Sequence, residues 1–531
     1  MNTRNTYRLI YNNDGTNILG NRMHDGRPLI PQDVYDYVDL VAGTPVTSFF
    51  ICTNSSMPYY DSAVERSIGC VPEDWEVDAS IRPNNEHWLK YGRAVQSLRE
   101  HGTDMISLCV ERARAHDLEA FASMRMNDLH SLDTAVRQPL AQGDFWLEHP
   151  EYRVGPHPGW HADGALDFAR EEVRRYKLAM IEEICRRFDI DGLELDFMRF
   201  PVYFPAGTGP DHLATMTDFV RAARAIAARE GARRGRPIML SARVPCHLDH
   251  CRWLGFDPAA WARAELVDFL TASCFFFDYP LPLATFRAGL GRDYDLPLYA
   301  ALEDGVARFG GREKRTHDMY RVAAAHCHAE GADGLYLFNY FLDRRQPTEW
   351  FGAEPPGSAR LPDNFRGRVG GVKVGPARPL LHELADPAKL TGRGRRYALT
   401  VRRDEYGFDL AGPLPVELAV GESADIAIEI CDDPGADGFT GAVLVTRSSG
   451  DPAPSFAFNG ATLEPLAADA PEAAHCHDGP LAMHTEHVPP VPRLWRVPVD
   501  GLRPGRNHLR ITAGADLFVT ETDLVLIAGA P

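Results

Sequence analysis

The stretch Asp191-Gly-Leu-Glu-Leu-Asp-Phe-Met-Arg-Phe-Pro201 decides the fold of the first part of the chain. It is a short apolar run that ends in polar residues directly after an amphipathic helical pattern, which predicts a β-strand after a helix. Because side chains alternate along a strand, Leu193 and Leu195 are expected to pack against helices, while Glu194 and Asp196 face the other side. Buried acids are costly unless they are paired or used in a reaction, so this strand is the first candidate for a functional site.

Similar short apolar runs recur along the first 340 residues and alternate with helical patterns. With the strand above, they are Tyr7–Asn12, Thr47–Cys52, Leu118–Arg125, Ile190–Asp196, Ile238–Val244, Val267–Phe275, Leu298–Glu303 and Gly334–Asn339. The clearest helical patterns are Asp167–Phe188, Thr217–Glu230 and Lys314–Glu330. Eight strands that alternate with helices predict an α/β protein with a (β/α)₈ TIM barrel, which we place in residues 1–352.

An Asp-Gly pair opens two of these strands, at Asp191-Gly192 and at Asp333-Gly334. Each pair directly follows a helical pattern. We therefore expect the glycine to supply the tight turn from helix to strand.

The chain changes character after Phe351. Residues 353–394 are rich in Gly, Pro and Arg and are predicted to form a linker. Residues 395–531 contain short alternating strands, which predicts an accessory, all-β sandwich of the jelly-roll type. These strands are Tyr397–Val401, Leu414–Val420, Ala424–Cys431, Gly441–Val445, Trp495–Pro498, His508–Ile511 and Asp523–Ile527.

Composition limits the classes of partner. The chain has 531 residues and a formal net charge of -18, which argues against nucleic acid or an anionic membrane as the main partner. No signal peptide and no membrane-spanning stretch is visible, so a cytoplasmic location is expected, or a secreted one if a leader was removed. Ten scattered cysteines indicate reduced thiols more than a disulfide framework. We expect no cofactor, and self-association into a homo-oligomer is left open.

Acids also end the seventh predicted strand. Glu303 is in phase to face inward, with Asp304 starting the loop, and Asp278 follows the sixth strand. A carboxylate on strand four opposite one on strand seven is an arrangement that cleaves glycosidic bonds, since one acid protonates the leaving oxygen while the other attacks carbon or activates water. We therefore name Asp196, Glu194, Glu303 and Asp278 as catalytic candidates.

Structural explanations of the same residues remain open. Glu194 and Asp196 could form ion pairs with Arg125 on strand three and Arg243 on strand five. Asp278 could be an ordinary turn residue, and so could the pair Asp304-Gly305.

Polar and aromatic residues gather at the predicted carboxyl ends of the strands, where barrels of this type bind ligands. Planar amides, charged groups and aromatic faces are what sugars need. The substrate-binding candidates are Asn12, Asp14, Asn54, Arg125, Asn127, His157, Trp160, His161, Arg199, Tyr203, Arg243, His247, Asn339 and Tyr340.

The stretch Cys246-His247-Leu-Asp249-His250-Cys251 contains residue types that bind zinc. Its spacing fits no standard zinc pattern, so no metal site is predicted.

The segments Leu166–Tyr176 and Ile181–Pro201 together resemble the glycosyl-hydrolase-like TIM-barrel proteins of the family-10-like group, in the clan-A-like glycoside hydrolase superfamily. The resemblance covers a Val-Arg helix, the Asp-Gly strand and the Arg-Phe-Pro loop. It implies an O-glycosyl hydrolase with a carbohydrate substrate, and it puts Asp196 at the position of the strand-four acid.

The resemblance leaves open two assignments of the nucleophile and the acid/base to strands four and seven. Barrels like the α-galactosidases use the strand-four Asp as nucleophile, whereas the β-glycosidases carry the acid/base on strand four and the nucleophile on strand seven. Because strand four lacks an Asn-Glu pair, we expect Asp196 to be nucleophile or base and Glu303 or Asp278 to donate the proton. The alternatives to a glycosidase are a carbohydrate-binding barrel without catalysis and a metal-dependent hydrolase or lyase.

Overall fold

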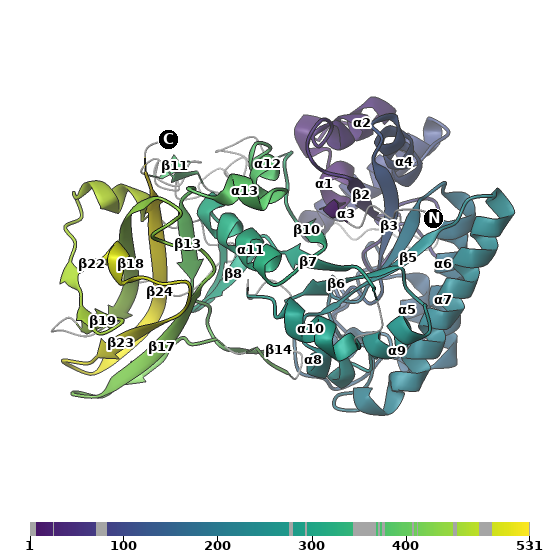
Figure 1. Ribbon diagram of the computed structural model, residues 1–531. Helices are drawn as coiled ribbons and strands as arrows, with labels where there is room; N and C mark the ends of the chain where they lie inside the picture. The colour runs from purple at the N-terminus through teal and green to yellow at the C-terminus, as the bar shows by residue number, and fades with distance from the viewer. Residues whose placement is uncertain are drawn as a thin grey trace.

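The computed structural model describes residues 7–24, 26–70, 82–274, 280–291, 295–343, 368–369, 372–373, 377–405, 408–410, 412–449, 454–476 and 491–529. Eight parallel strands close into a barrel (Figure 1). They are β1 (Arg8–Asn13), β2 (Ser48–Cys52), β3 (Glu119–Arg125), β4 (Gly192–Asp196), β5 (Met239–Pro245), β6 (Phe269–Ser273), β7 (Leu298–Leu302) and β10 (Gly334–Phe338). All eight lie where the sequence predicts them, so the TIM barrel is confirmed.

Helices connect the strands and cover the outside of the barrel (Figure 1). The three helical patterns correspond to α6 (Glu171–Arg187), α7 (Leu213–Arg234) and α11 (His317–Ala329). The others in the barrel are α1 (Thr16–Leu19), α2 (Pro31–Asp39), α3 (Arg82–Glu100), α4 (Met105–Ala115), α5 (Asp144–Glu148), α8 (Leu248–Trp253), α9 (Pro258–Arg263) and α10 (Leu283–Leu290). None of the helices in the described ranges is long and apolar enough to cross a membrane.

The two Asp-Gly glycines serve a different purpose from the one expected. Neither Gly192 nor Gly334 has a left-handed backbone, so neither is needed for a turn. A Cβ on Gly192 would lie 2.0 Å from a ring carbon of Phe121, and one on Gly334 would lie 2.0 Å from the carbonyl oxygen of Arg8. The expectation of a turn glycine is therefore wrong, because close packing at the start of the strand is what excludes a side chain.

The aspartates that precede these strands bind the neighbouring strand. The Asp191 carboxylate accepts a hydrogen bond from the Ala120 N–H at 2.8 Å, and the Asp333 carboxylate accepts one from the Leu298 N–H at 2.7 Å. Asp268, before β6, accepts from the Leu240 N–H in the same way at 2.7 Å. Each aspartate satisfies a backbone donor at the bottom of the barrel and aligns two adjacent strands.

Most strands of the C-terminal region lie in two antiparallel sheets, as predicted, and β14 (Arg403–Glu405) pairs with β15 (Phe408–Leu410) in a separate two-stranded sheet. The larger sheet contains β13 (Arg395–Ala398), β16 (Val416–Leu418), β18 (Phe439–Ser449), β21 (Glu464–Pro465), β22 (Arg493–Val497) and β24 (Leu517–Ala528); the smaller contains β17 (Ser423–Ile430), β19 (Ser455–Phe458), β20 (Ala461–Thr462) and β23 (Gly505–Thr512). Along β17, buried isoleucines alternate with exposed residues, as expected for a sheet with one face on a core. Phe456 and Trp495, from different sheets, have ring centroids 4.9 Å apart.

The segment predicted as a linker contains two short helices where it is described, α12 (Leu380–Leu384) and α13 (Pro387–Leu390). Leu380, Leu381 and Leu384 are buried, and both helices contact α11. The predicted domain limits themselves stay a prediction.

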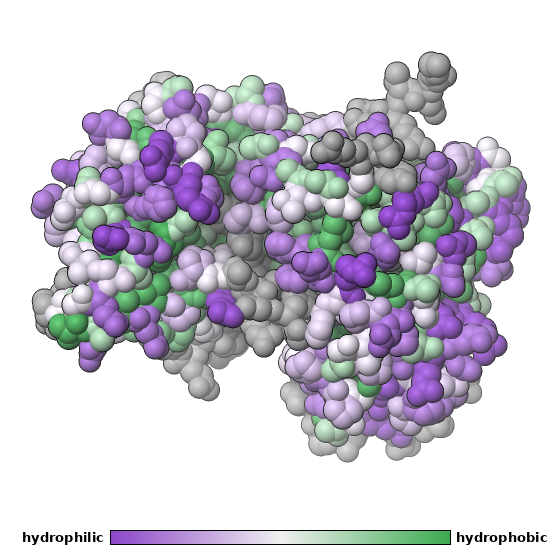
Figure 2. Space-filling model, turned by 60° about the horizontal axis from the view of Figure 1, so that its bottom comes forward, coloured by the Kyte–Doolittle hydropathy of each residue, from purple (hydrophilic) through white to green (hydrophobic). Residues whose placement is uncertain are grey.

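Hydrophilic residues spread over both lobes of the face shown in Figure 2, with hydrophobic residues in scattered patches. This distribution fits the 24% of charged residues in the chain and is ordinary for a globular surface.

Candidate functional site

One arginine connects the acids of strands four and seven. Nη1 of Arg243, on β5, lies 3.1 Å and 3.2 Å from the two carboxylate oxygens of Asp196. Nη2 of the same guanidinium binds Oε1 of Glu303, directly after β7. The Arg243 Cζ also lies 4.0 Å from the centre of the Phe338 ring at the end of β10. All four side chains are buried, so one guanidinium binds two acids at the carboxyl ends of the strands.

One carboxylate oxygen of Glu303 accepts hydrogen bonds from the described residues, and the other does not. Its Oε1 accepts a second hydrogen bond, from the Ser273 hydroxyl at 2.6 Å, while its Oε2 is buried and has no hydrogen-bond partner among the described residues. The main chain at this point is also held, because Arg315 Nε donates to the Glu303 carbonyl at 2.7 Å. A buried, unsatisfied carboxylate oxygen is costly unless water or a ligand binds it.

Asp196 is held by its own loop. Its Oδ1 accepts hydrogen bonds from the backbone N–H groups of Met198 at 2.9 Å and Arg199 at 3.2 Å. Together with the Arg243 contacts, these bonds occupy the carboxylate and shape the chain where it leaves β4.

Glu194 lies deeper on the same inner face of β4. Its Oε1 accepts hydrogen bonds from the Ser123 hydroxyl at 2.7 Å and the Tyr336 hydroxyl at 2.8 Å, and its buried Oε2 has no partner among the described residues. Burial, and then the charge of Asp196, raise the pKa of Glu194 to about 8. This acid is therefore mostly protonated at neutral pH.

The ion-pair interpretation is half confirmed by these contacts. Arg243 does pair with Asp196. Arg125 instead pairs with Asp14 at 2.8 Å and Asp128 at 3.0 Å, so it belongs to a second cluster of charges.

The second cluster continues from Asp128 to a histidine. Asp128 Oδ1 lies 2.6 Å from His130 Nδ1, and His130 Nε2 lies 3.0 Å from Arg199 Nη2. Burial by itself raises the pKa of Asp128, but the contacts with His130 and Arg125 lower it well below the ordinary value. Because a guanidinium only donates, His130 Nε2 accepts from Arg199 while His130 Nδ1 faces Asp128, and these contacts link the loops after β3 and β4.

Trp160 covers this second cluster. The indole is 50% exposed, and its ring centroid lies 5.5 Å from that of Phe200 and 5.9 Å from that of His130. An exposed aromatic face beside polar groups is the kind of surface on which a sugar ring stacks. Its neighbour His161 has a left-handed backbone, at φ 52°.

Two predicted asparagines offer unsatisfied groups at the mouth. Both amide atoms of Asn12, at the end of β1, are buried without a partner among the described residues, and so is Oδ1 of Asn339 after β10. Such groups bind hydroxyls well because an amide both donates and accepts.

Four other predicted residues brace loops. The Asn54 side chain binds the N–H and carbonyl of Arg125, and Asn127 Nδ2 donates to the carbonyls of Leu166 and Val202. The Tyr203 hydroxyl donates to the Phe197 carbonyl, and the Tyr340 hydroxyl to the Ala377 carbonyl. Their polar atoms are used within the protein.

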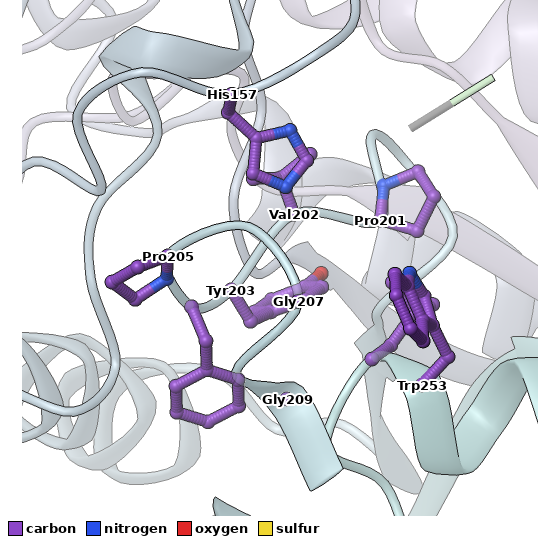
Figure 3. A pocket seen from close by; sticks show the side chains of 10 residues that line it. His157, Pro201, Val202, Tyr203, Pro205, Gly207, Gly209 and Trp253 are labelled. Carbon is purple, nitrogen blue, oxygen red and sulfur yellow. The ribbon is translucent and has the colours of Figure 1, made fainter. Parts of the chain in front are cut away.

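His157 and Tyr203 line a small pocket with Pro205 and Trp253 (Figure 3). Its volume of about 20 Å³ is that of roughly one water, so it is too small for a sugar ring. His247 is exposed at the start of α8, with its ring beside that of His250.

The remaining expectations concern metals and thiols. The Cys251 thiol donates to the Pro245 carbonyl at 3.3 Å, and the ten cysteines, all within the described ranges, form no disulfide. Within the described ranges, His24, Asp33 and Asp36 are close enough to surround an ion, but Arg27 already pairs with Asp33. Asp278 lies outside the described residues.

Sequence reasoning missed several members of the site: Ser123, Ser273, Tyr336, Phe338 and His130. The first four are inward-facing by strand alternation, which was the signal that could have found them. His130 follows β3 in a loop, where no periodicity applies.

Comparison with known proteins gives no family. No family model matches the chain, and no curated protein matches it.

Three solved structures illustrate the structural matches. The endo-β-1,4-mannanase from Thermotoga petrophila is 10% identical, with a TM-score of 0.44 over 98% of this chain and 97% of that one. The α-L-fucosidase isoenzyme 2 from Paenibacillus thiaminolyticus is 13% identical, with a TM-score of 0.40 over 72% of this chain and 48% of that one. A cycloisomaltooligosaccharide glucanotransferase from Paenibacillus sp. is 10% identical, with a TM-score of 0.33 over 98% of this chain and 58% of that one. At these values we draw no conclusion about chemistry from the matches.

Proposed function

We propose that the protein hydrolyses a glycosidic bond at the mouth of the barrel, with Glu303 as the reacting carboxylate and Glu194 as the proton donor. The observation that carries the proposal is the state of Glu303. One of its oxygens is anchored by Arg243 and Ser273, and the other is buried without a partner in the described chain.

The chemistry needs one ionised and one protonated acid. Glu303, which the Arg243 guanidinium and the Ser273 hydroxyl hold in place, is the carboxylate that would attack the anomeric carbon or take a proton from water. Glu194, whose pKa is raised to about 8, carries the proton that the leaving oxygen requires. Environments that separate two acids in this way are typical of such pairs.

This division of labour differs from the one expected from the sequence. Asp196 has its carboxylate occupied by Met198, Arg199 and Arg243. In the proposal, Asp196 orients the guanidinium, which in turn orients Glu303.

The substrate class follows from neutral groups that lie after the strands of the barrel. Asn12 and Asn339 have unsatisfied buried amide atoms, which suit sugar hydroxyls, and Trp160 supplies an exposed ring. The proposed partner is thus a carbohydrate.

One observation favours a second function, carbohydrate binding without turnover. Arg243 contacts both Asp196 and Glu303, and a cation shared by two acids weakens each as a nucleophile. A barrel that only binds sugar would need no reactive carboxylate.

The two functions are separated by one experiment. The wild-type protein and Glu303→Gln are tested against a panel of aryl glycosides and oligosaccharides, with turnover and calorimetric binding measured on the same samples. We expect wild-type turnover, and loss of turnover but not of binding in Glu303→Gln. Glu171→Gln, an exposed glutamate on α6, is the matched control. Binding without turnover in the wild type would favour the second function.

A further inference from the structure

A β-hairpin begins two residues after Glu303. It consists of β8 (Gly305–Arg308) and β9 (Gly311–Lys314), which pair antiparallel. At its base, Asp304 forms ion pairs with Lys314 and Arg312. Arg315 closes the base, because its N–H donates to the Asp304 carbonyl at 3.1 Å and its Nε to the Glu303 carbonyl at 2.7 Å. The hairpin and the Glu303 main chain are one hydrogen-bonded unit.

The tip of the hairpin is bound by the C-terminal sheets. Arg308 is buried, and its Nη1 and Nη2 lie 2.8 Å and 2.7 Å from the two carboxylate oxygens of Asp523 on β24. Nη1 also donates to the Leu399 carbonyl at 3.1 Å. The rings of Phe309 and Phe518 pack edge to face with centroids 5.1 Å apart. Figure 1 shows β8 on the side of the barrel that faces β13 and β24.

Further charges surround Asp523 inside the sheet. Arg396 Nε donates to Asp523 at 2.6 Å, and Glu521 lies 3.5 Å from Arg396 and 3.1 Å from Arg447. Arg308 also pairs with Glu313 of its own hairpin at 2.6 Å. Burial by itself raises the pKa of Asp523, but Arg308 and Arg396 lower it below its ordinary value. Asp523 is therefore a buried anion, and a bidentate pair with a buried arginine has one well-defined geometry.

We propose that Arg308 and Asp523 are positioning residues for Glu303. In this arrangement the C-terminal sheets hold the hairpin tip, and the hairpin base holds the main chain of Glu303. The C-terminal domain then forms part of the active-site architecture. The effect of this contact on catalysis rests on the proposed function. The coupling itself, by which the Asp523 contact orders the main chain at the end of β7, does not.

A simpler role would be adhesion between the two domains. In that case, loss of the Asp523 charge would lower global stability and leave Glu303 where it is in the folded protein. A positioning role therefore predicts that loss of the Asp523 charge disorders the end of β7 and lowers kcat more than it changes KM. Simple adhesion predicts neither effect in the folded protein.

The test uses the full-length chain with Asp523→Asn, which keeps the shape of the side chain and removes its charge. Hydrogen exchange is followed in peptides that cover residues 298–315 and, for comparison, β4. We expect amide exchange in residues 302–315 to become at least roughly tenfold faster while β4 stays unchanged. Asp425→Asn is the matched control, because Asp425 forms an exposed bidentate pair with Arg510 in the same domain; it should change neither region.

The kinetic arm uses whichever glycoside the wild type hydrolyses. Asp523→Asn should lower kcat roughly tenfold with KM within about twofold of wild type, because misplacing a reacting group by a fraction of an ångström weakens the transition state more than binding. Arg308→Lys, which keeps the charge and loses the bidentate geometry, should behave in the same way and replaces Asp523→Asn should that variant not fold.

The outcomes separate the two proposals. Unchanged exchange at residues 302–304 in a folded variant would overturn the coupling. Faster exchange with wild-type kcat on a glycoside that the wild type hydrolyses would overturn the role of Arg308 and Asp523 as positioning residues. Should the wild type hydrolyse no glycoside, the proposed function fails while hydrogen exchange still decides the coupling.

Discussion

At the scale of single residues, the site depends on Arg243. It is buried between Asp196 and Glu303, and its charge is the reason that two acids can lie together away from water. Strand alternation was enough to predict that Glu194, Asp196 and Glu303 face inward. It could not predict that Arg243 also binds Glu303, because Arg243 is on β5 and Glu303 follows β7, and β6 lies between these two strands.

Replacing Arg243 with Met leaves two buried carboxylates without the cation that binds both of them. We expect Arg243→Met to lower the free energy of unfolding by about 3–5 kcal/mol, measured by urea denaturation at neutral pH. Arg510→Met, which breaks an exposed pair with Asp425, should leave stability essentially unchanged. Equal stability of Arg243→Met and wild type would show that Arg243 does not balance the two acids.

Glu194 should make stability depend on pH. Its pKa is raised from 4.5 to about 8 in the folded protein, so between these values the native state keeps a proton that the unfolded chain releases. The free energy of unfolding should therefore fall as pH rises through this window. Urea denaturation from pH 4 to 9 measures the slope, and Glu194→Gln should flatten it. A variant with the wild-type slope would refute the raised pKa.

At the scale of elements, the glycines and aspartates at the starts of the strands set the barrel geometry. The sequence predicted the strands and the Asp-Gly pairs, but assigned Gly192 to a turn. The actual reason, contact with the Phe121 ring, depends on a neighbour 71 positions away in the chain. Local sequence patterns do not contain that information. The short helices α12 and α13 were missed in the predicted linker because Pro and Gly around them mask a brief apolar pattern.

Gly192→Ala tests the packing at the start of β4. A Cβ there would lie 2.0 Å from Phe121, so the ring or the strand must move, at a cost of about 1–3 kcal/mol. Thermal and urea unfolding measure the change. Gly501→Ala is the control, since its Cβ would have no neighbour closer than 4.0 Å. The double variant with Phe121→Leu should recover part of the loss, and no recovery would argue against this contact.

At the scale of the whole molecule, the barrel and the C-terminal sheets share a buried ion network. Arg308 and Asp523 are 215 positions apart, and neither belongs to a motif, so the sequence predicted two domains without their connection. Both partners are buried. The predicted description of the sheets as an accessory therefore understates how closely the two parts are joined.

Removing the C-terminal domain tests this connection. Residues 1–394 alone would leave Arg308 without Asp523 and uncover the contact between α11 and β13. We expect the truncated chain to aggregate or to melt well below the full chain, by circular dichroism and light scattering. A truncated chain as stable as the full one would show that the domains are independent.

The central claim is that Glu303 is the reacting carboxylate and Glu194 the proton donor. The most direct measurement compares Glu303→Gln and Glu194→Gln on two glycosides that share the sugar cleaved by the wild type and differ in leaving group. Loss of a proton donor should slow the poor leaving group by about 10²–10⁴-fold and spare the good one, so Glu194→Gln should keep activity on the good leaving group only. Glu303→Gln should lose activity on both. Wild-type turnover by Glu303→Gln on either glycoside would contradict the account.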